Sequence, residues 1–87
     1  MNKYSVNILS KAYDALSKID KPIAKRITDK LAWFSENIEN INTIPLTGNL
    51  SGLYKLKVGA YRMVYEIDHE RKIITVHKIG HRRDIYK

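Results

Sequence analysis

Residues 52–65 have the sequence Gly-Leu-Tyr-Lys-Leu-Lys-Val-Gly-Ala-Tyr-Arg-Met-Val-Tyr, and they carry the clearest structural signal in the chain. Two runs rich in Tyr, Val and Leu are separated by a Gly-Ala pair, which predicts a β-hairpin with strands at 53–58 and 61–68. A polar group of three residues then leads into another apolar run, so we expect a third strand at 72–79. The C-terminal part is therefore predicted to be an antiparallel meander of three strands.

The N-terminal part of the chain predicts one strand and two helices. Tyr4, Val6 and Ile8 alternate with polar residues, as in a short strand with one buried face. Ser10 follows as a candidate helix N-cap, and Asp20, two residues before a proline, is a candidate N-cap for a second helix. Apolar residues recur at spacings of three and four along that second helix, namely Ile23, Ile27, Leu31, Phe34 and Ile38.

The order of these elements indicates the fold class. Helices that precede the strands, rather than alternating with them, are typical of an α+β domain. We expect an N-terminal strand, a two-helix hairpin and the three-stranded meander, with the helices packed on one face of the sheet. Residues 40–52 are rich in Asn, Thr, Ser and Gly and are expected to form an ordered loop. At 87 residues the chain is expected to be a single domain, 1–87.

The composition excludes several classes of protein. Hydrophobic residues make up 44% of the chain, but no run of 18 apolar residues exists, so we expect no membrane partner and a cytoplasmic location. The absence of cysteine excludes disulfides, thiolate metal sites and cysteine nucleophiles. No histidine or carboxylate spacing suits a metal, and no Gly-rich phosphate loop is present, so we expect neither a metal nor a cofactor.

The charge of the chain is strongly basic and uneven. The chain has 16 Lys and Arg residues against 9 Asp and Glu. Residues 1–50 carry seven basic and five acidic residues, whereas residues 51–87 carry nine and four. A basic surface attracts polyanions through counterion release, so nucleic acid is the first candidate partner and an acidic protein segment is the second. A solvated basic surface without a partner is the alternative.

The basic residues of the C-terminal part form the main candidate site. Lys55 and Lys57 are two residues apart on a strand, so their side chains leave the same face, and Arg62 lies across the hairpin turn. Four more candidates lie beyond the third strand, namely His81, Arg82, Arg83 and Tyr86. Like charges repel, so such a cluster indicates a bound anion, which we take to be a phosphodiester. The alternative is that the lysines form the wet face of an edge strand.

Three motifs in a fixed order resemble those of a known family. They are Leu-Thr-Gly at 46–48, the hairpin sequence at 52–65, and Ile-Gly-His-Arg-Arg-Asp-Ile-Tyr at 79–86. Together they look like the RelE/ParE superfamily of toxins from type II toxin–antitoxin systems, and the resemblance covers nearly the whole chain. The N-terminal strand and the two helices also agree with that family.

The resemblance implies a function. RelE-type members are ribosome-dependent endoribonucleases that cut messenger RNA in the decoding site without a metal ion. The residues that match their catalytic set are Lys55, Lys57, Arg62, Arg82 and Tyr86. The adjacent Arg83 could fill the role of Arg82. The resemblance implies the ribosome and messenger RNA as partners, and a cognate antitoxin with an acidic, partly disordered segment. The alternative is a ParE-like toxin that inhibits DNA gyrase without catalysis, although that branch lacks this residue set.

The chemistry of RNA cleavage suggests how this set would act. Attack by the 2′-hydroxyl requires a base, cations that stabilise the phosphorane, and an acid for the leaving 5′-oxygen. In this hypothesis Lys55 or Lys57 is the general base, and Arg62 stabilises the phosphorane. Arg82 assists the leaving group, and Tyr86 stacks on a nucleobase. His81 is the rival general acid or general base.

Overall fold

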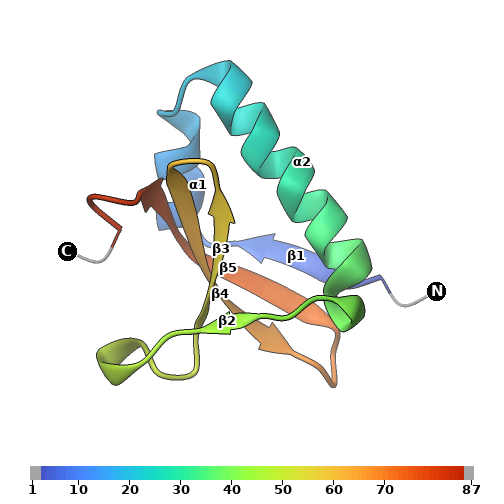
Figure 1. Cartoon of the computed structure of the whole chain (residues 1–87). Coiled ribbons are helices and arrows are strands. Elements are labelled where there is room, and N and C mark those ends of the chain that lie inside the picture. The colour runs from blue at the N-terminus through green and yellow to red at the C-terminus, as the bar shows by residue number, and fades with distance from the viewer. Residues whose placement is uncertain (1–2, 86–87) are drawn as a thin grey trace.

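The structure, a computed structural model, describes residues 3–85 (Figure 1). The strands are β1 (Ser5–Ile8), β2 (Ile44–Pro45), β3 (Tyr54–Val58), β4 (Tyr61–Asp68) and β5 (Ile73–His81). The helices are α1 (Ser10–Ser17) and α2 (Lys21–Asn37), and two short 3₁₀ helices are η1 (Ile38–Asn40) and η2 (Gly48–Leu50). Within the described part of the chain, no helix is long and apolar enough to cross a membrane.

The strands form one five-stranded sheet with the order β1-β5-β4-β3-β2. The predicted meander is confirmed, because β3 pairs with β4 and β4 with β5 in antiparallel fashion. The N-terminal strand β1 joins the far side of the meander and runs parallel to β5. The α+β prediction is therefore confirmed. Along the chain, both helices lie between the first strand and the meander (Figure 1).

Two local predictions were wrong. The loop expected at 40–52 contains an edge strand, since Ile44 lies opposite Lys55 and Pro45 opposite Tyr54. An edge position tolerates a proline, which has no N–H to donate. The N-cap of α1 is Leu9 rather than Ser10. The N–H of Leu9 donates to the carbonyl of Val76 at 3.0 Å, so the chain passes from the β1–β5 pairing directly into the helix.

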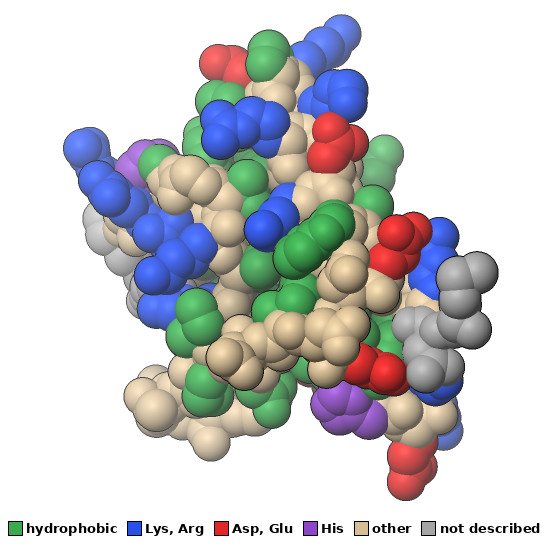
Figure 2. All heavy atoms as spheres, turned by 45° about the vertical axis from the view of Figure 1, so that its right-hand side comes forward, with side chains coloured by type: hydrophobic (Ala, Val, Ile, Leu, Met, Phe, Trp, Pro, Cys, Tyr) green, Lys and Arg blue, Asp and Glu red, His purple; other side chains and the backbone are tan. Residues whose placement is uncertain are grey.

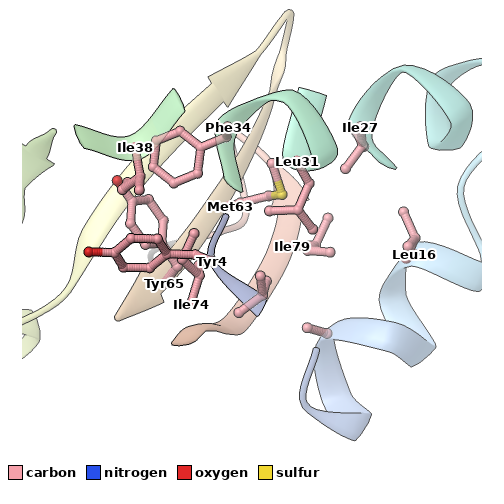
Figure 3. Close-up of a cluster of buried hydrophobic side chains, with 12 residues drawn as sticks. Tyr4, Leu16, Ile27, Leu31, Phe34, Ile38, Met63, Tyr65, Ile74 and Ile79 are labelled. Atoms are coloured by element: carbon pink, nitrogen blue, oxygen red, sulfur yellow. The ribbon is translucent and has the colours of Figure 1, made fainter. Parts of the chain in front are cut away.

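The second helix begins as predicted. Asp20 is the N-cap and Pro22 lies in the first turn, although the Asp20 side chain makes no capping hydrogen bond. The predicted apolar stripe packs on one face of the sheet, where Phe34 meets Tyr65 edge to face with ring centroids 5.0 Å apart (Figure 3). The stripe residues buried there are Ile27, Leu31, Phe34 and Ile38, and Ile23 is partly buried.

Tyr65 is the largest fully buried side chain, and its hydroxyl has no hydrogen-bond partner among the described residues. Its ring stacks on Tyr54 with centroids 5.8 Å apart. Burial raises the pKa of the Tyr65 hydroxyl above its ordinary value, and the nearby Tyr54 raises it further. The polar atom of this side chain is therefore kept neutral inside the core.

Side chains on the other face of the same strands have a different character. Met63 and Tyr65 of β4 lie in the core, so Arg62 and Val64, which alternate with them, point to the opposite face of the sheet. We call that opposite face the cationic face. Its residues nearest the hairpin turn are Lys55, Lys57, Arg62, Val64, Lys78 and Gly80. Glu66 of β4 lies on the same face, farther from the turn.

Candidate functional site

The strand register groups the cationic face into two rows that cross three strands. One row contains Lys57, Arg62 and Gly80, and the other contains Lys55, Val64 and Lys78. Directly opposite side chains in an antiparallel pair have Cβ atoms about 4.5–5.5 Å apart, and successive rows are about 7 Å apart. The structure thus brings the hairpin residues Lys55, Lys57 and Arg62 to one face.

The hairpin turn fixes the position of Arg62. Gly59 has a φ of 58°, a conformation that suits glycine at the first central position of a two-residue turn. The Arg62 Nη1 donates to the carbonyls of Gly59 at 2.8 Å and Tyr61 at 2.9 Å. Both bonds use one of the three guanidinium nitrogens, so the side chain is anchored at the tip of the hairpin while keeping other donors.

The segment after β5 returns to the same hairpin tip. The N–H of Arg82 donates to the carbonyl of Ala60 at 2.8 Å. The N–H groups of Asp84 and Ile85 then donate to the carbonyl of His81, at 2.9 and 3.0 Å, which turns the chain back over the sheet. The side chain of Arg82 is exposed. The backbone of Arg82 therefore lies next to the turn that carries Arg62.

A glycine in the Arg62 row allows this return. A Cβ at Gly80 would lie 3.3 Å from Cδ1 of Ile85, which is closer than most real contacts of a Cβ. Ile85 is buried even though it lies near the end of the chain. Gly80 thus lets Ile85 cover the sheet and hold the C-terminal segment against the cationic face.

The other C-terminal candidates have different surroundings. His81 lies opposite Tyr61, and their rings meet edge to face with centroids 5.5 Å apart. The His81 Nδ1 accepts a hydrogen bond from the N–H of Arg83 at 3.2 Å. The side chain of Arg83 is exposed. Tyr86 lies outside the described residues, so its predicted place in the site has no structural counterpart here.

Comparison with known proteins decides the family. The sequence model of a protein family, the ParE toxin of the type II toxin-antitoxin system parDE, matches residues 6–86. The chain belongs to this toxin family. Membership in the RelE/ParE superfamily of toxin–antitoxin toxins, predicted from the sequence motifs, is therefore confirmed.

Individual relatives agree with this assignment. Toxin RelG of Mycobacterium tuberculosis is 37% identical over 43 residues, which are 49% of this chain and 49% of that protein. The chain thus spans about half the length of the curated relative that it matches. The toxin–antitoxin complex RelBE2 from Mycobacterium tuberculosis contains a similar chain, with a TM-score of 0.84, 26% identity and 97% of each chain covered.

An archaeal structure extends the likeness in fold. The RelE–RelB complex from Pyrococcus horikoshii OT3 contains a chain with a TM-score of 0.75 and 24% identity. The match covers 97% of the present toxin and 99% of that chain.

The structure also adds two cations to the site of this toxin that sequence reasoning missed. Lys78 lies in the same row as Lys55, and its even spacing from Gly80 along β5 could have revealed it. Arg26 of α2 reaches the hairpin tip, where its Nη2 lies 3.8 Å from the position of a Cβ on Gly59. No local sequence signal places a residue of α2 there, because the contact depends on how the helix crosses the sheet.

The surface of the toxin reflects this gathering of positive charge. Lys and Arg side chains crowd the left side of Figure 2, the side on which the C-terminal segment lies in Figure 1. Among residues 3–85, no group of three His, Asp or Glu side chains is placed to hold a metal ion. The arrangement can bind a phosphodiester through several cations at once.

Proposed function

We propose that this toxin is a ribosome-dependent, metal-independent endoribonuclease that cleaves messenger RNA in the decoding site and thereby inhibits translation. One observation carries the proposal. Lys57 lies directly opposite Arg62, and the backbone of Arg82 is bonded to the turn between their strands. Two cations of one hairpin and the backbone of a third cationic residue, from the C-terminal segment, therefore lie at the hairpin end of the sheet, which supports a site for a single scissile phosphate.

The proposed reaction is attack of the RNA 2′-hydroxyl on the adjacent phosphorus. Lys57 or Lys55 removes the 2′ proton, and Arg62 stabilises the charge that develops on the phosphorane. The Arg62 Nη1 is bonded to the turn, so the guanidinium is held in place without a further loss of side-chain freedom. Arg82 assists departure of the 5′-oxygen.

The remaining predicted residues complete this scheme. Tyr86 stacks on a base, and Arg83 is the alternative to Arg82. His81 is the rival acid or base, although its Nδ1 already accepts the Arg83 N–H. Because Nε2 is the other ring nitrogen, a proton transfer by His81 would use that atom.

The ribosome supplies what the site lacks. A row of cations binds RNA through its charge but does not fix the in-line geometry of the 2′-hydroxyl and the leaving oxygen. A message held in the decoding site is already fixed. We therefore expect codon-phased cuts on translating ribosomes and little cutting of free RNA.

A cognate antitoxin is the second proposed partner. Similar chains in two structures are bound in RelBE-type toxin–antitoxin complexes. The cationic face suits a partly disordered antitoxin segment that carries acidic and apolar residues, because such a segment neutralises the charge as it becomes ordered.

The test compares arginine variants in cells and on purified ribosomes. We expect Arg62→Ala to lower the rate of messenger cleavage by about 100-fold or more, since it removes a donor that stabilises developing charge. Arg82→Ala should also impair cleavage, and it retains the backbone bond to Ala60. Mapping of messenger 5′ ends after induction gives the readout, and circular dichroism checks the fold.

Arg71→Ala is the matched control, because Arg71 is an exposed arginine in the β4–β5 turn whose nearest acidic partner, Asp68, is 3.8 Å away. This variant should cleave messenger RNA like the unchanged toxin.

Inhibition of DNA gyrase is the alternative function, because the family that matches the chain is named after the ParE toxin. Growth arrest that persists in a folded Arg62→Ala, Arg82→Ala double variant, without new messenger ends, would replace the nuclease proposal with that alternative.

A further inference from the structure

The cationic face contains a pocket that the proposed cleavage reaction does not use. Its volume is about 570 Å³, and it lies between the start of α1, the segment before β3, and strands β4 and β5. The apolar part of its lining comes from Leu9, Leu50, Leu53 and Val64. A cavity of this size with an apolar lining and a few polar groups is typical of a small-ligand site.

The pocket adjoins the candidate site through the second row of the cationic face. Val64, which lines it, is opposite Lys55 on one side and Lys78 on the other. Lys11 and Lys78 also line a neighbouring hollow that continues to Gly80 and Ile85. The pocket is therefore one row, or about 7 Å along the strands, from the row that contains Arg62.

A histidine in the pocket is held by a carboxylate. The His77 Nε2 lies 2.6 Å from Oε1 of Glu66, and the His77 side chain is about one-third exposed. This bond fixes the orientation of the ring and leaves Nδ1 as its remaining polar atom. His77 lines both the pocket and the neighbouring hollow.

We propose that this pocket binds one nucleobase of single-stranded RNA, next to the nucleotide whose phosphodiester lies at Arg62. The apolar walls contact the faces of the base, Nδ1 of His77 hydrogen-bonds its edge, and Lys78 with Lys11 binds the attached phosphate. This inference rests on the proposed function for the position of the RNA. It makes His77 and Lys78 determinants of which codons are cut.

The mixture of groups favours a nucleotide over a purely apolar ligand. Leu50 and Leu53 are partly exposed and offer apolar contact to the face of a base, above the buried Val64. Lys11 and Lys78 beside those walls favour a ligand that carries an anion within a few ångströms of its apolar group, as a nucleotide does. The two rows of the cationic face would then bind successive phosphates of one extended strand.

Binding of a non-cleavable RNA tests this directly. The probe is a 2′-O-methyl tetranucleotide, compared with the same molecule lacking one base. We expect the complete probe to bind at least about 5-fold more tightly than the abasic one, because the abasic probe leaves the apolar lining of the pocket in contact with water. In nuclear magnetic resonance spectra, the signals of Leu50, Leu53 and Val64 should shift with the complete probe and shift far less with the abasic one.

Variants assign the polar contacts. His77→Ala should reduce the preference for the complete probe over the abasic one, because the edge contact is lost while the phosphates still bind. Lys78→Gln should weaken both probes by several-fold. Lys21→Gln is the control, since Lys21 is an exposed lysine at the start of α2 and makes the same change in charge.

The outcomes separate this inference from the proposed function. Shifts confined to Lys57 and Arg62, with equal affinity for both probes, would overturn the base pocket even if Arg62→Ala abolishes cleavage. Shifts in the pocket with an acidic peptide and not with RNA would also overturn it. Conversely, base-dependent shifts in the pocket uphold it even if Arg62→Ala still cleaves, in which case only the catalytic proposal fails.

Discussion

The two faces of β4 differ in character, since one packs into the core and the other carries the cations of the proposed site. Met63 and Tyr65 point into the core beneath α2, whereas Arg62 and Val64 point to the cationic face. Side chains alternate along a strand, so neighbours only one residue apart meet an apolar helix on one side and a row of cations on the other. Substitutions on the two faces should therefore be separable, with one set affecting folding and the other affecting the proposed activity.

The largest change in the free energy of unfolding is expected on the core face of the sheet, the face on which α2 packs. Phe34→Ala should lower the free energy of unfolding by about 3–5 kcal/mol, because it removes a buried ring and leaves a cavity against Tyr65. Urea denaturation gives the measurement. Trp33→Ala is the matched control, since Trp33 is the preceding residue on α2, is 48% exposed and has the Lys30 Nζ 4.4 Å above its ring.

The control should lower stability by no more than about 1 kcal/mol, the usual worth of an exposed cation–π contact. If both variants lose the same stability, the ring of Phe34 does not contribute to the core as its 1% exposure indicates.

A smaller effect on the same face depends on pH. The pKa of Tyr65 is raised in the folded state, mainly by burial and secondly by Tyr54. The unfolded chain therefore releases this proton first, from about pH 10 upward, and stability falls by up to about 1.4 kcal/mol per pH unit. Below about pH 10 the group is neutral in both states and contributes no pH dependence.

Tyr65→Phe isolates this group. The free energy of unfolding of the variant should fall less steeply between about pH 10 and 11 than that of the unchanged toxin. Near neutral pH the variant should be at least as stable, because it removes a buried hydroxyl without a partner among the described residues. Tyr13→Phe, at a position 63% exposed, is the control and should leave the slope unchanged. Equal slopes for Tyr65→Phe and the unchanged toxin would contradict the pKa argument.

The sequence predicted the core face better than the cationic face. The spacing of Ile27, Leu31 and Phe34 predicted a buried helical stripe, because burial on one side imposes its own period. The cationic face was only partly predictable. Lys55 and Lys57 follow from alternation, but apolar residues occupy both faces of β4, so the register of Arg62 could not be fixed by pattern.

Other features needed the fold itself. The register of β4 against β5 shifts between Val64 and Tyr65, and no local motif marks that irregularity. The pairing of His77 with Glu66 depends on it, since the two residues are eleven positions apart on neighbouring strands. The short strand at Ile44 is a product of its pairing with β3 and has too few residues to form a pattern.

Repulsion between two cations predicts a small change in stability on the cationic face. Lys57 and Arg62 are like charges directly opposite each other, which destabilises a strand pair by roughly 0.2–1 kcal/mol. Lys57→Gln should therefore raise the free energy of unfolding slightly at low salt. The gain should disappear in 1 M salt, where the screening length falls to about 3 Å.

Lys55→Gln is the matched control for this variant, because Lys55 is on the same strand and face but lies opposite the apolar Val64. It should change stability less than Lys57→Gln. If Lys57→Gln is instead destabilising at every salt concentration, the lysine stem contributes packing that exceeds the repulsion. A small gain in stability combined with loss of messenger cleavage would show that this residue is kept for its charge at the expense of the fold.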